Sequence, residues 1–293
     1  MSRNKSYQRT RNLFNPDSKV PYRLSRSRLE NFVNCPRCFY LDRRLGIEPP
    51  AGPSFTLNSA VDELLKKEFD GFRRLRQPHP LCKAYGVEAI PFAHPMLEEW
   101  REVFKGIQYH HPSTNFLIFG AVDDIWADAR GQLMVVDYKS TSTDQTISLD
   151  SEYRQAYKRQ MEIYQWLLRK QKLNVSNTGY FVYCNADRAK KGFNSKLEFS
   201  IQLIAYEGND GWIEDVVMAA HECLRSEQLP QYFPACPFCN YRQASRLLEA
   251  DQNTDSASSI INVKSNGILG EDLSKISEYR SVRPEVQGEL FNQ

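Results

Sequence analysis

The chain has 293 residues, of which 41% are hydrophobic and 25% are charged, as expected for a globular protein with a buried core. Lysine and arginine total 38 against 36 aspartate and glutamate residues, so the formal net charge is only +2. This balance excludes a histone-like basic protein. Any contact with nucleic acid must come from local basic patches.

The sequence predicts a cytoplasmic location. The longest strongly apolar run covers residues 116–122 and is too short to span a bilayer. The basic, polar N-terminus lacks the apolar core of a secretory signal. In the cytoplasm the seven cysteines stay reduced, so closely spaced pairs suggest a metal site before a disulfide.

Both ends of the chain differ in composition from the middle. Residues 1–21 are basic and lack periodic apolar positions, which predicts a flexible arm, either a solubilising tail or a DNA-binding segment. Residues 246–293 are polar and uneven, which predicts a mostly disordered tail. A single folded domain is expected over residues 22–245.

The pattern within this domain predicts a mixed α/β (α+β) fold. Apolar residues recur at helical spacing in residues 25–44, 56–69, 97–104, 153–172 and 209–228. Residues 116–127 and 132–139 are expected to form a β-hairpin, residues 178–184 a central strand and residues 196–206 an edge strand. Residues 77–95, rich in proline and histidine, are expected to be loop.

The segment Val135-Val136-Asp137-Tyr138-Lys139 is the most informative part of the chain. Asp137 and Lys139 lie two residues apart on a strand, so both side chains point to one face. Burying these charges is costly unless they are paired or bind a metal. Asp123 or Asp124 lies across the hairpin, and an acidic pair there would hold a divalent cation. Two carboxylates and a lysine suit metal-assisted hydrolysis of a phosphodiester.

Three further polar residues accompany this group. Gln160 and Tyr164 are four residues apart on the following helix and share a face, from which they would support the lysine or contact a phosphate. Asp62 lies beside the apolar stripe of the helix at 56–69. Each of these residues, like the D-x-K triplet, would by itself be read as an ordinary polar or salt-bridged residue.

The order of these motifs resembles the RecB-like branch of the PD-(D/E)XK nuclease superfamily, which includes RecB and AddB nuclease domains and CRISPR-associated exonucleases. The resemblance covers residues 24–242. The matching pieces are Leu24-Ser25-x-Ser27-Arg28, Cys35-Pro36-x-x-Phe39-Tyr40, the helix 57–65, Gly120-x-x-Asp123, Asp137-x-Lys139 and Gln160-x-x-x-Tyr164. The resemblance implies a restriction-endonuclease-like core, in which a central mixed sheet is flanked by helices, and DNA as substrate. It also implies that Asp123 and Asp137 hold Mg²⁺ or Mn²⁺, and that Lys139 is catalytic.

The sequence departs from this family at Asp62, where relatives usually carry a metal-binding histidine. Aspartate is a harder ligand than imidazole, so Asp62 would favour Mg²⁺. The alternative is that the site is weakened. Asp124 is the alternative to Asp123, because a one-residue slip moves a side chain to the other face.

Two C-x2-C pairs flank the domain, Cys35 with Cys38 and Cys236 with Cys239. Four thiolates would tie its two ends together around Zn²⁺ or a [4Fe–4S] cluster. The resemblance favours iron–sulfur, although relatives often combine one N-terminal with three C-terminal cysteines. Two unrelated pairs of buried cysteines remain the alternative. Cys82, Cys184 and Cys223 are expected to be ordinary core or loop residues.

The tail ends in Gln287-Gly288-Glu289-Leu290-Phe291, which resembles the peptide that docks replication and repair proteins on the bacterial sliding clamp. The alternative is a tail without function. Taken together, these features predict a metal-dependent DNA nuclease of repair or recombination. A non-catalytic DNA-binding or clamp-associated adaptor that retains the nuclease fold is the second hypothesis, supported by the Asp62 departure.

Overall fold

The computed structural model describes residues 8–50, 52, 54–151 and 154–258. The chain divides into two compact units, residues 1–240 and 241–293. The first unit contains two β-sheets with flanking helices, and this confirms the predicted mixed α/β fold. Helix α8 (Pro237–Ser258) begins in the first unit and supplies the described part of the second.

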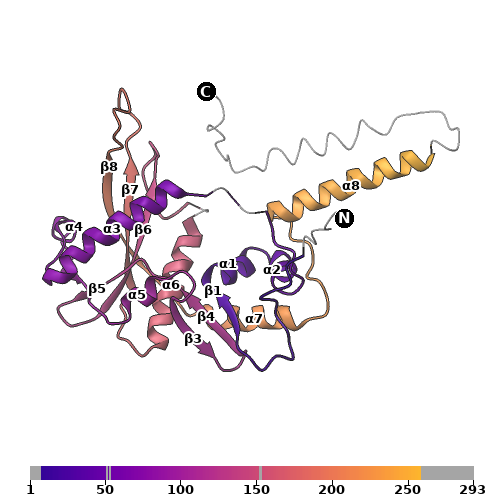
Figure 1. Cartoon of the computed structure of the whole chain (residues 1–293), viewed down its shortest axis with the longest axis horizontal. Coiled ribbons are helices and arrows are strands. Elements are labelled where there is room, and N and C mark those ends of the chain that lie inside the picture. Colours follow the sequence, from indigo (N-terminus) through magenta and orange to yellow (C-terminus); the bar gives the residue numbers. More distant parts are fainter. Residues whose placement is uncertain (1–7, 51, 53, 152–153, 259–293) are drawn as a thin grey trace, which may run out of the picture. The chain divides into compact units, whose positions relative to one another are not determined.

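The larger sheet is mixed and has five strands in the order β2-β5-β6-β7-β8 (Figure 1). Its strands are β2 (Ala89–Pro91), β5 (Asp124–Asp128), β6 (Leu133–Thr141), β7 (Thr178–Ala186) and β8 (Phe199–Glu207). Strands β6 and β7 are parallel and are joined through helix α6 (Gln155–Lys170), whereas the other neighbours pair antiparallel. A parallel pair requires such a crossover connection.

The smaller sheet has three strands in the order β1-β4-β3. Strand β1 (Tyr22–Ser25) runs parallel to β4 (Phe116–Gly120), and β3 (Ile107–His111) pairs antiparallel with β4. Strand β4 is followed after only three residues by β5 of the larger sheet. The predicted single strand over residues 116–127 is therefore wrong. The chain changes sheets at residues 121–123, and only β5 forms the hairpin with β6.

Strand β6 separates the two main hydrophobic clusters. Met134 and Val136 pack with Leu65 and Phe69 of helix α3 (Thr56–Leu75). Leu133 and Val135 belong to the cluster that contains the buried face of α6. Because side chains alternate along a strand, Asp137 and Lys139 share the face that α6 covers.

The remaining helices are short or peripheral. They are α1 (Arg26–Asn34), α2 (Pro36–Arg43), α4 (Pro80–Ala84), α5 (Leu97–Arg101) and α7 (Ile213–Arg225). The predicted helix over 25–44 breaks at Cys35, which is extended because it precedes Pro36. The predicted loop over 77–95 contains α4 and β2. Among the helices described, none has the length and apolar character needed to cross a bilayer.

The described part of the N-terminal arm contacts the folded domain. Phe14 is buried and its ring packs against Tyr22 and Phe116. The Arg9 guanidinium lies 3.0 Å from an Asp42 oxygen. At the other end, residues 246–258 continue α8, where the sequence predicts a mostly disordered tail. The predicted clamp peptide, Gln287–Phe291, lies outside the described residues.

Candidate active site

Asp137 is fully buried on β6, and neither of its carboxylate oxygens accepts a hydrogen bond from the described residues. The Lys139 ammonium forms an ion pair with Asp137 Oδ2. It also lies 4.8 Å from the ring centroid of Tyr157 on α6. A buried carboxylate without hydrogen bonds is costly, and its free oxygens are suited to holding a cation.

The pKa values of Asp137 and Lys139 are both raised, for different physical reasons. Burial raises the pKa of Asp137 to about 6, although Lys139 lowers it. Burial lowers the pKa of Lys139, but Asp137 and Asp123 raise it above its usual value. The lysine is therefore protonated at neutral pH and can donate hydrogen bonds.

Asp123 lies at the point where the chain passes from β4 to β5. Its Oδ2 accepts a hydrogen bond from the backbone N–H of Tyr138 over 2.9 Å. Arg101 Nε donates to the Asp123 carbonyl oxygen over 2.9 Å, which fixes the backbone at the crossing. The Asp123 side chain is 21% exposed, so it remains accessible to an ion from solvent.

Asp124 occupies a different environment from Asp123. Its buried carboxylate pairs with Arg73 and Arg101 and accepts a hydrogen bond from the Tyr138 hydroxyl over 2.8 Å. Burial raises the pKa of Asp124 despite both arginines. Arg73 lies on α3, and Phe69 of the same helix packs against Tyr138, so the Asp124 carboxylate lies among groups on the α3 side of the sheet.

Asp62 lies on α3 and pairs with a residue that sequence reasoning missed. Lys66 Nζ is 2.7 Å from Asp62 Oδ2 and 3.5 Å from Asp123 Oδ1. Burial raises the pKa of Asp62, and Asp123 raises it further. The i,i+4 spacing of Asp62 and Lys66 could have predicted their ion pair from sequence. The contact of Lys66 with Asp123 could not be predicted in this way, because it depends on the tertiary fold.

Gln160 and Tyr164 lie together on α6, as their spacing predicts. Gln160 Nε2 donates to the Tyr164 hydroxyl over 3.0 Å. The Tyr164 ring is buried against the end of β4, where a Cβ on Gly120 would lie 2.7 Å from Tyr164 Cε1. Burial raises the pKa of Tyr164, and both Asp123 and Asp137 add to this effect. Because Gly120 has no side chain, the Tyr164 ring can pack against the end of β4 at this position.

The acidic residues do not form a tight ligand group. Within the described residues, the four cysteines are the one set of three or more potential ligands whose atoms all lie within 4.8 Å of one another. Asp62 and Asp123 share the ammonium of Lys66, whereas Asp137 pairs with Lys139. Asp137 Oδ1 has no partner among the described residues and suits a divalent cation, whereas Asp137 Oδ2 and Asp62 Oδ2 each pair with a lysine.

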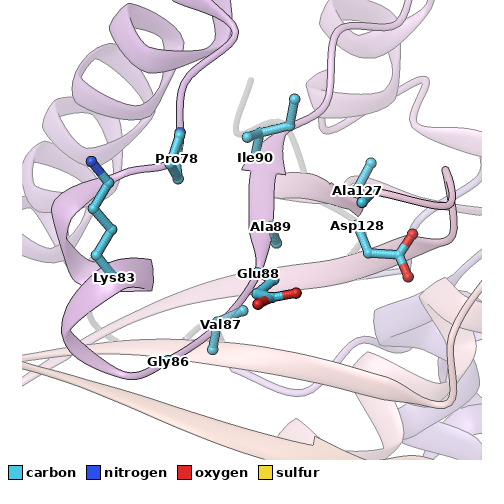
Figure 2. Close-up of a pocket in the computed structure, with 10 residues that line it drawn as sticks. Pro78, Lys83, Gly86, Val87, Glu88, Ala89, Ile90, Ala127 and Asp128 are labelled. Carbon is cyan, nitrogen blue, oxygen red and sulfur yellow. The ribbon is translucent and has the colours of Figure 1, made fainter.

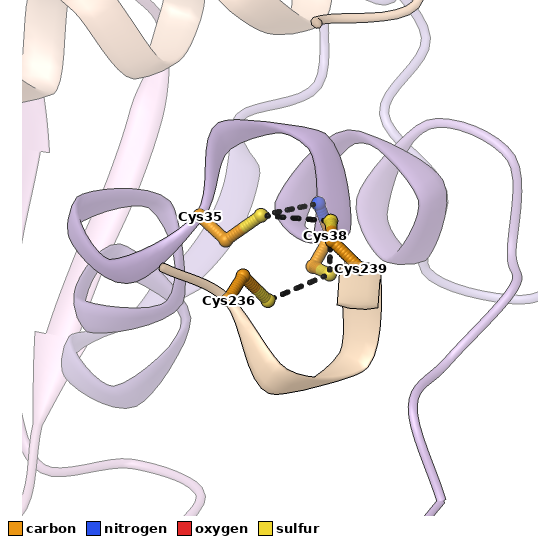
Figure 3. Close-up of side chains that lie close together, drawn as sticks. All are labelled: Cys35, Cys38, Cys236 and Cys239. Atoms are coloured by element: carbon orange, nitrogen blue, oxygen red, sulfur yellow. Dashed lines mark hydrogen bonds between the residues drawn. The ribbon is translucent and has the colours of Figure 1, made fainter. Parts of the chain in front are cut away.

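The four cysteines form a compact cluster (Figure 3). Cys35 Sγ lies 3.6 Å from Cys239 Sγ, and Cys38 Sγ lies 3.6 Å from Cys236 Sγ and 3.8 Å from Cys239 Sγ. These distances exclude disulfides, which require about 2.05 Å. Burial raises the pKa of Cys35 to about 11. The arrangement is consistent with a metal site that joins segments 198 residues apart.

A pocket of about 560 Å³ lies at the opposite end of β5 from Asp123. Figure 2 shows Lys83 on one side of it and Glu88 and Asp128 on the other. None of the candidate site residues lines this pocket.

A family model described as the PD-(D/E)XK nuclease superfamily matches residues 23–244, and the chain belongs to this superfamily. Membership supports a nuclease-type hydrolase and implies DNA as the substrate. No curated protein matches the chain. The solved crystal structure of SSO0001 is 15% identical, with 71% of this chain and 79% of that chain covered and a TM-score of 0.30. This likeness is too low to support an argument.

Proposed function

We propose that the protein is a metal-dependent deoxyribonuclease of the RecB-like branch that acts in DNA repair or recombination. Asp137 supports this proposal most strongly, because its two buried oxygens accept no hydrogen bond within the described chain and face a charged lysine. Such a carboxylate is stabilised by a cation that shares it. The ordered motifs that resemble RecB-like nucleases support the branch and the repair role.

Asp123 and Asp137 would hold Mg²⁺ or Mn²⁺ in this proposal. When bound, the ion polarises the phosphoryl group and lowers the pKa of a coordinated water. Lys139 stays protonated and donates a hydrogen bond to the attacking water or to a phosphate oxygen. Gln160 and Tyr164 support the lysine face of the site through their mutual hydrogen bond.

The turn between β7 and β8 is the proposed contact surface for DNA. Strands β7 and β8 extend into a hairpin that projects from the sheet (Figure 1). Its turn carries the exposed cations Arg188, Lys190, Lys191 and Lys196, together with Phe193, which is 72% exposed. Because β6 and β7 are parallel, this turn lies beyond the end of β6 that carries Lys139. Exposed cations beside an exposed aromatic ring suit a nucleic-acid backbone and its bases.

For the four cysteines we propose Zn²⁺ rather than the [4Fe–4S] cluster that the resemblance favours. Four sulfurs at about 2.3 Å from one zinc ion stand about 3.8 Å apart at the corners of a tetrahedron. Three sulfur–sulfur separations of 3.6–3.8 Å match this spacing, and all four sulfurs lie within 4.8 Å of one another. A [4Fe–4S] cluster would hold its thiolates much farther apart, around a four-iron cube.

Two further proposals accompany the nuclease proposal. The sliding-clamp peptide Gln287–Phe291 stays a prediction from sequence. A non-catalytic DNA-binding adaptor is the second candidate function, and the Lys66 ammonium beside Asp123 favours it because it competes with a metal. The adaptor would bind DNA in a salt-sensitive way without hydrolysis.

Cleavage of labelled single- and double-stranded DNA with Mg²⁺ or Mn²⁺ tests the nuclease proposal. We expect hydrolysis by the wild type and none by Asp137→Ala or Lys139→Ala. DNA binding without cleavage under every cation would instead support the adaptor.

A further inference from the structure

Lys66 lies between two acidic residues that come from different elements. Its ammonium is 2.7 Å from Asp62 Oδ2 on α3 and 3.5 Å from Oδ1 of Asp123, which lies between β4 and β5. The Lys66 side chain is only 23% exposed, so its position is set by packing as well as by charge. One ammonium thus contacts a carboxylate on each side.

The space between two carboxylates from different elements is where a shared metal ion would bind. A lysine ammonium in that space already supplies positive charge, and a divalent ion can enter only by displacing it, because cations a few ångströms apart repel strongly. Asp137 pairs with one lysine through Oδ2, but its buried Oδ1 has no partner among the described residues. The geometry therefore distinguishes Lys66, which two carboxylates share, from Lys139, which pairs with Asp137 alone and leaves its Oδ1 available.

We propose that Lys66 is a resident cation that takes the place of a second metal ion. The site then holds a single divalent ion between Asp123 and Asp137, and Asp62 positions Lys66 instead of binding the metal. This inference rests on the proposed function, because it assumes a metal at Asp123 and Asp137. Lys66 is a positioning residue, since it acts through Asp123.

The same helix offers a matched control. Lys67 pairs with Glu63 over 2.6 Å with the same i,i+4 spacing, but both of these side chains are about two-thirds exposed. Exposed pairs of this kind contribute little to structure. A substitution at Lys67 thus removes one lysine charge from α3 without changing the acidic pair.

Counting bound Mn²⁺ by the loss of the free-ion signal in electron paramagnetic resonance tests the proposal without any activity measurement. Mn²⁺ prefers oxygen ligands to thiolates, so the cysteine cluster does not interfere. We expect a single ion in the wild type, Lys67→Gln and the charge-conserving Lys66→Arg. We expect a second ion in Lys66→Gln, and its loss in the double variant Lys66→Gln/Asp62→Asn.

Two ions in the wild type, or one in Lys66→Gln, would overturn the resident-cation role while leaving the metal site intact. A wild type that binds no Mn²⁺, or an Asp137→Asn variant that binds as the wild type does, would contradict the proposed metal site itself. The two failures are therefore distinguishable.

Discussion

The backbone N–H of Tyr138 donates a hydrogen bond to Asp123 Oδ2 over 2.9 Å. Tyr138 lies between Asp137 and Lys139 on β6, so this one bond attaches Asp123 to the strand that carries the other two candidate residues. The Tyr138 side chain points to the opposite face, where its hydroxyl donates to Asp124. The adjacent acidic residues therefore have different partners: Asp123 accepts from the β6 backbone, whereas Asp124 pairs with two arginines and the Tyr138 hydroxyl.

Replacing Gly120 by alanine should displace Tyr164. The new Cβ would lie 2.7 Å from Tyr164 Cε1 and 3.3 Å from Arg26 Cβ, and overpacking of this kind costs about 1–3 kcal/mol. We expect a lower melting temperature and slower DNA cleavage for Gly120→Ala. Gly71→Ala is the control, because the nearest atom is 3.9 Å away and alanine favours a helix. Unchanged stability and activity in Gly120→Ala would show that Tyr164 is not fixed by this contact.

Sequence patterns located most of the elements that carry the site but missed the change of sheet. Residues 116–127 are rich in apolar and β-branched residues. Gly120 and the adjacent Asp123 and Asp124 interrupt this run, but they do not by themselves show that the chain changes sheets there. Consequently, Asp123 and Asp124 could not be distinguished by alternation alone. Their separate environments depend on Arg73, Arg101 and Tyr138, which only the tertiary fold brings together.

For the cysteine cluster and for Lys66, local sequence spacing predicts some contacts, and only the tertiary structure shows the others. The spacing of the two C-x2-C pairs predicted a four-thiolate group, whereas the choice between zinc and iron–sulfur depends on sulfur–sulfur distances. The helical spacing of Lys66 indicates its contact with Asp62. Its second contact, with Asp123, joins residues 57 positions apart in the chain and cannot be read from local pattern.

The stability of the metal-free protein should depend on the ionisation of Asp137. Its pKa is raised to about 6 by burial, against about 3.9 in an unfolded chain. Below pH 4 both states are protonated, and above pH 6 both are ionised, so the folded state loses stability as pH rises between these values. The loss is of the order of 3 kcal/mol.

Thermal unfolding of the wild type and Asp137→Asn, in chelator from pH 4 to pH 7, measures this effect. The asparagine variant should gain stability relative to the wild type as pH rises. A constant difference in melting temperature across this range would contradict the burial of an ionisable carboxyl at this position.

The β7–β8 turn should contribute to DNA affinity through Lys191 and Lys196. Lys190 and Arg188 form ion pairs with nearby acids, whereas these two lysines form none with a described residue. Replacing both by alanine in an Asp137→Asn background should weaken DNA binding and reduce the slope of log K against log salt by about 2. Fluorescence anisotropy at several salt concentrations measures this. The double variant Lys83→Ala/Lys105→Ala is the control. An equal loss of DNA affinity in this control would contradict a specific contribution of the β7–β8 turn.

The purified protein should be colourless and contain zinc. Cys38→Ser and Cys236→Ser should each lose the metal and unfold at lower temperature, because binding links segments 198 residues apart and metal affinity contributes folding energy. Cys223→Ala should retain it. Elemental analysis with an absorption spectrum checks this result, and a brown protein that contains iron would refute the zinc assignment.

DNA cleavage by matched variants at β6 tests the central claim most directly. With Mg²⁺ or Mn²⁺, the wild type should hydrolyse labelled DNA, while Asp137→Asn and Lys139→Ala should reduce the rate by about 10³-fold or more, as expected when groups that stabilise transition-state charge are removed. The folded state of each variant is verified by its melting temperature. Metal-dependent cleavage at the wild-type rate by both variants would contradict the assignment of this site.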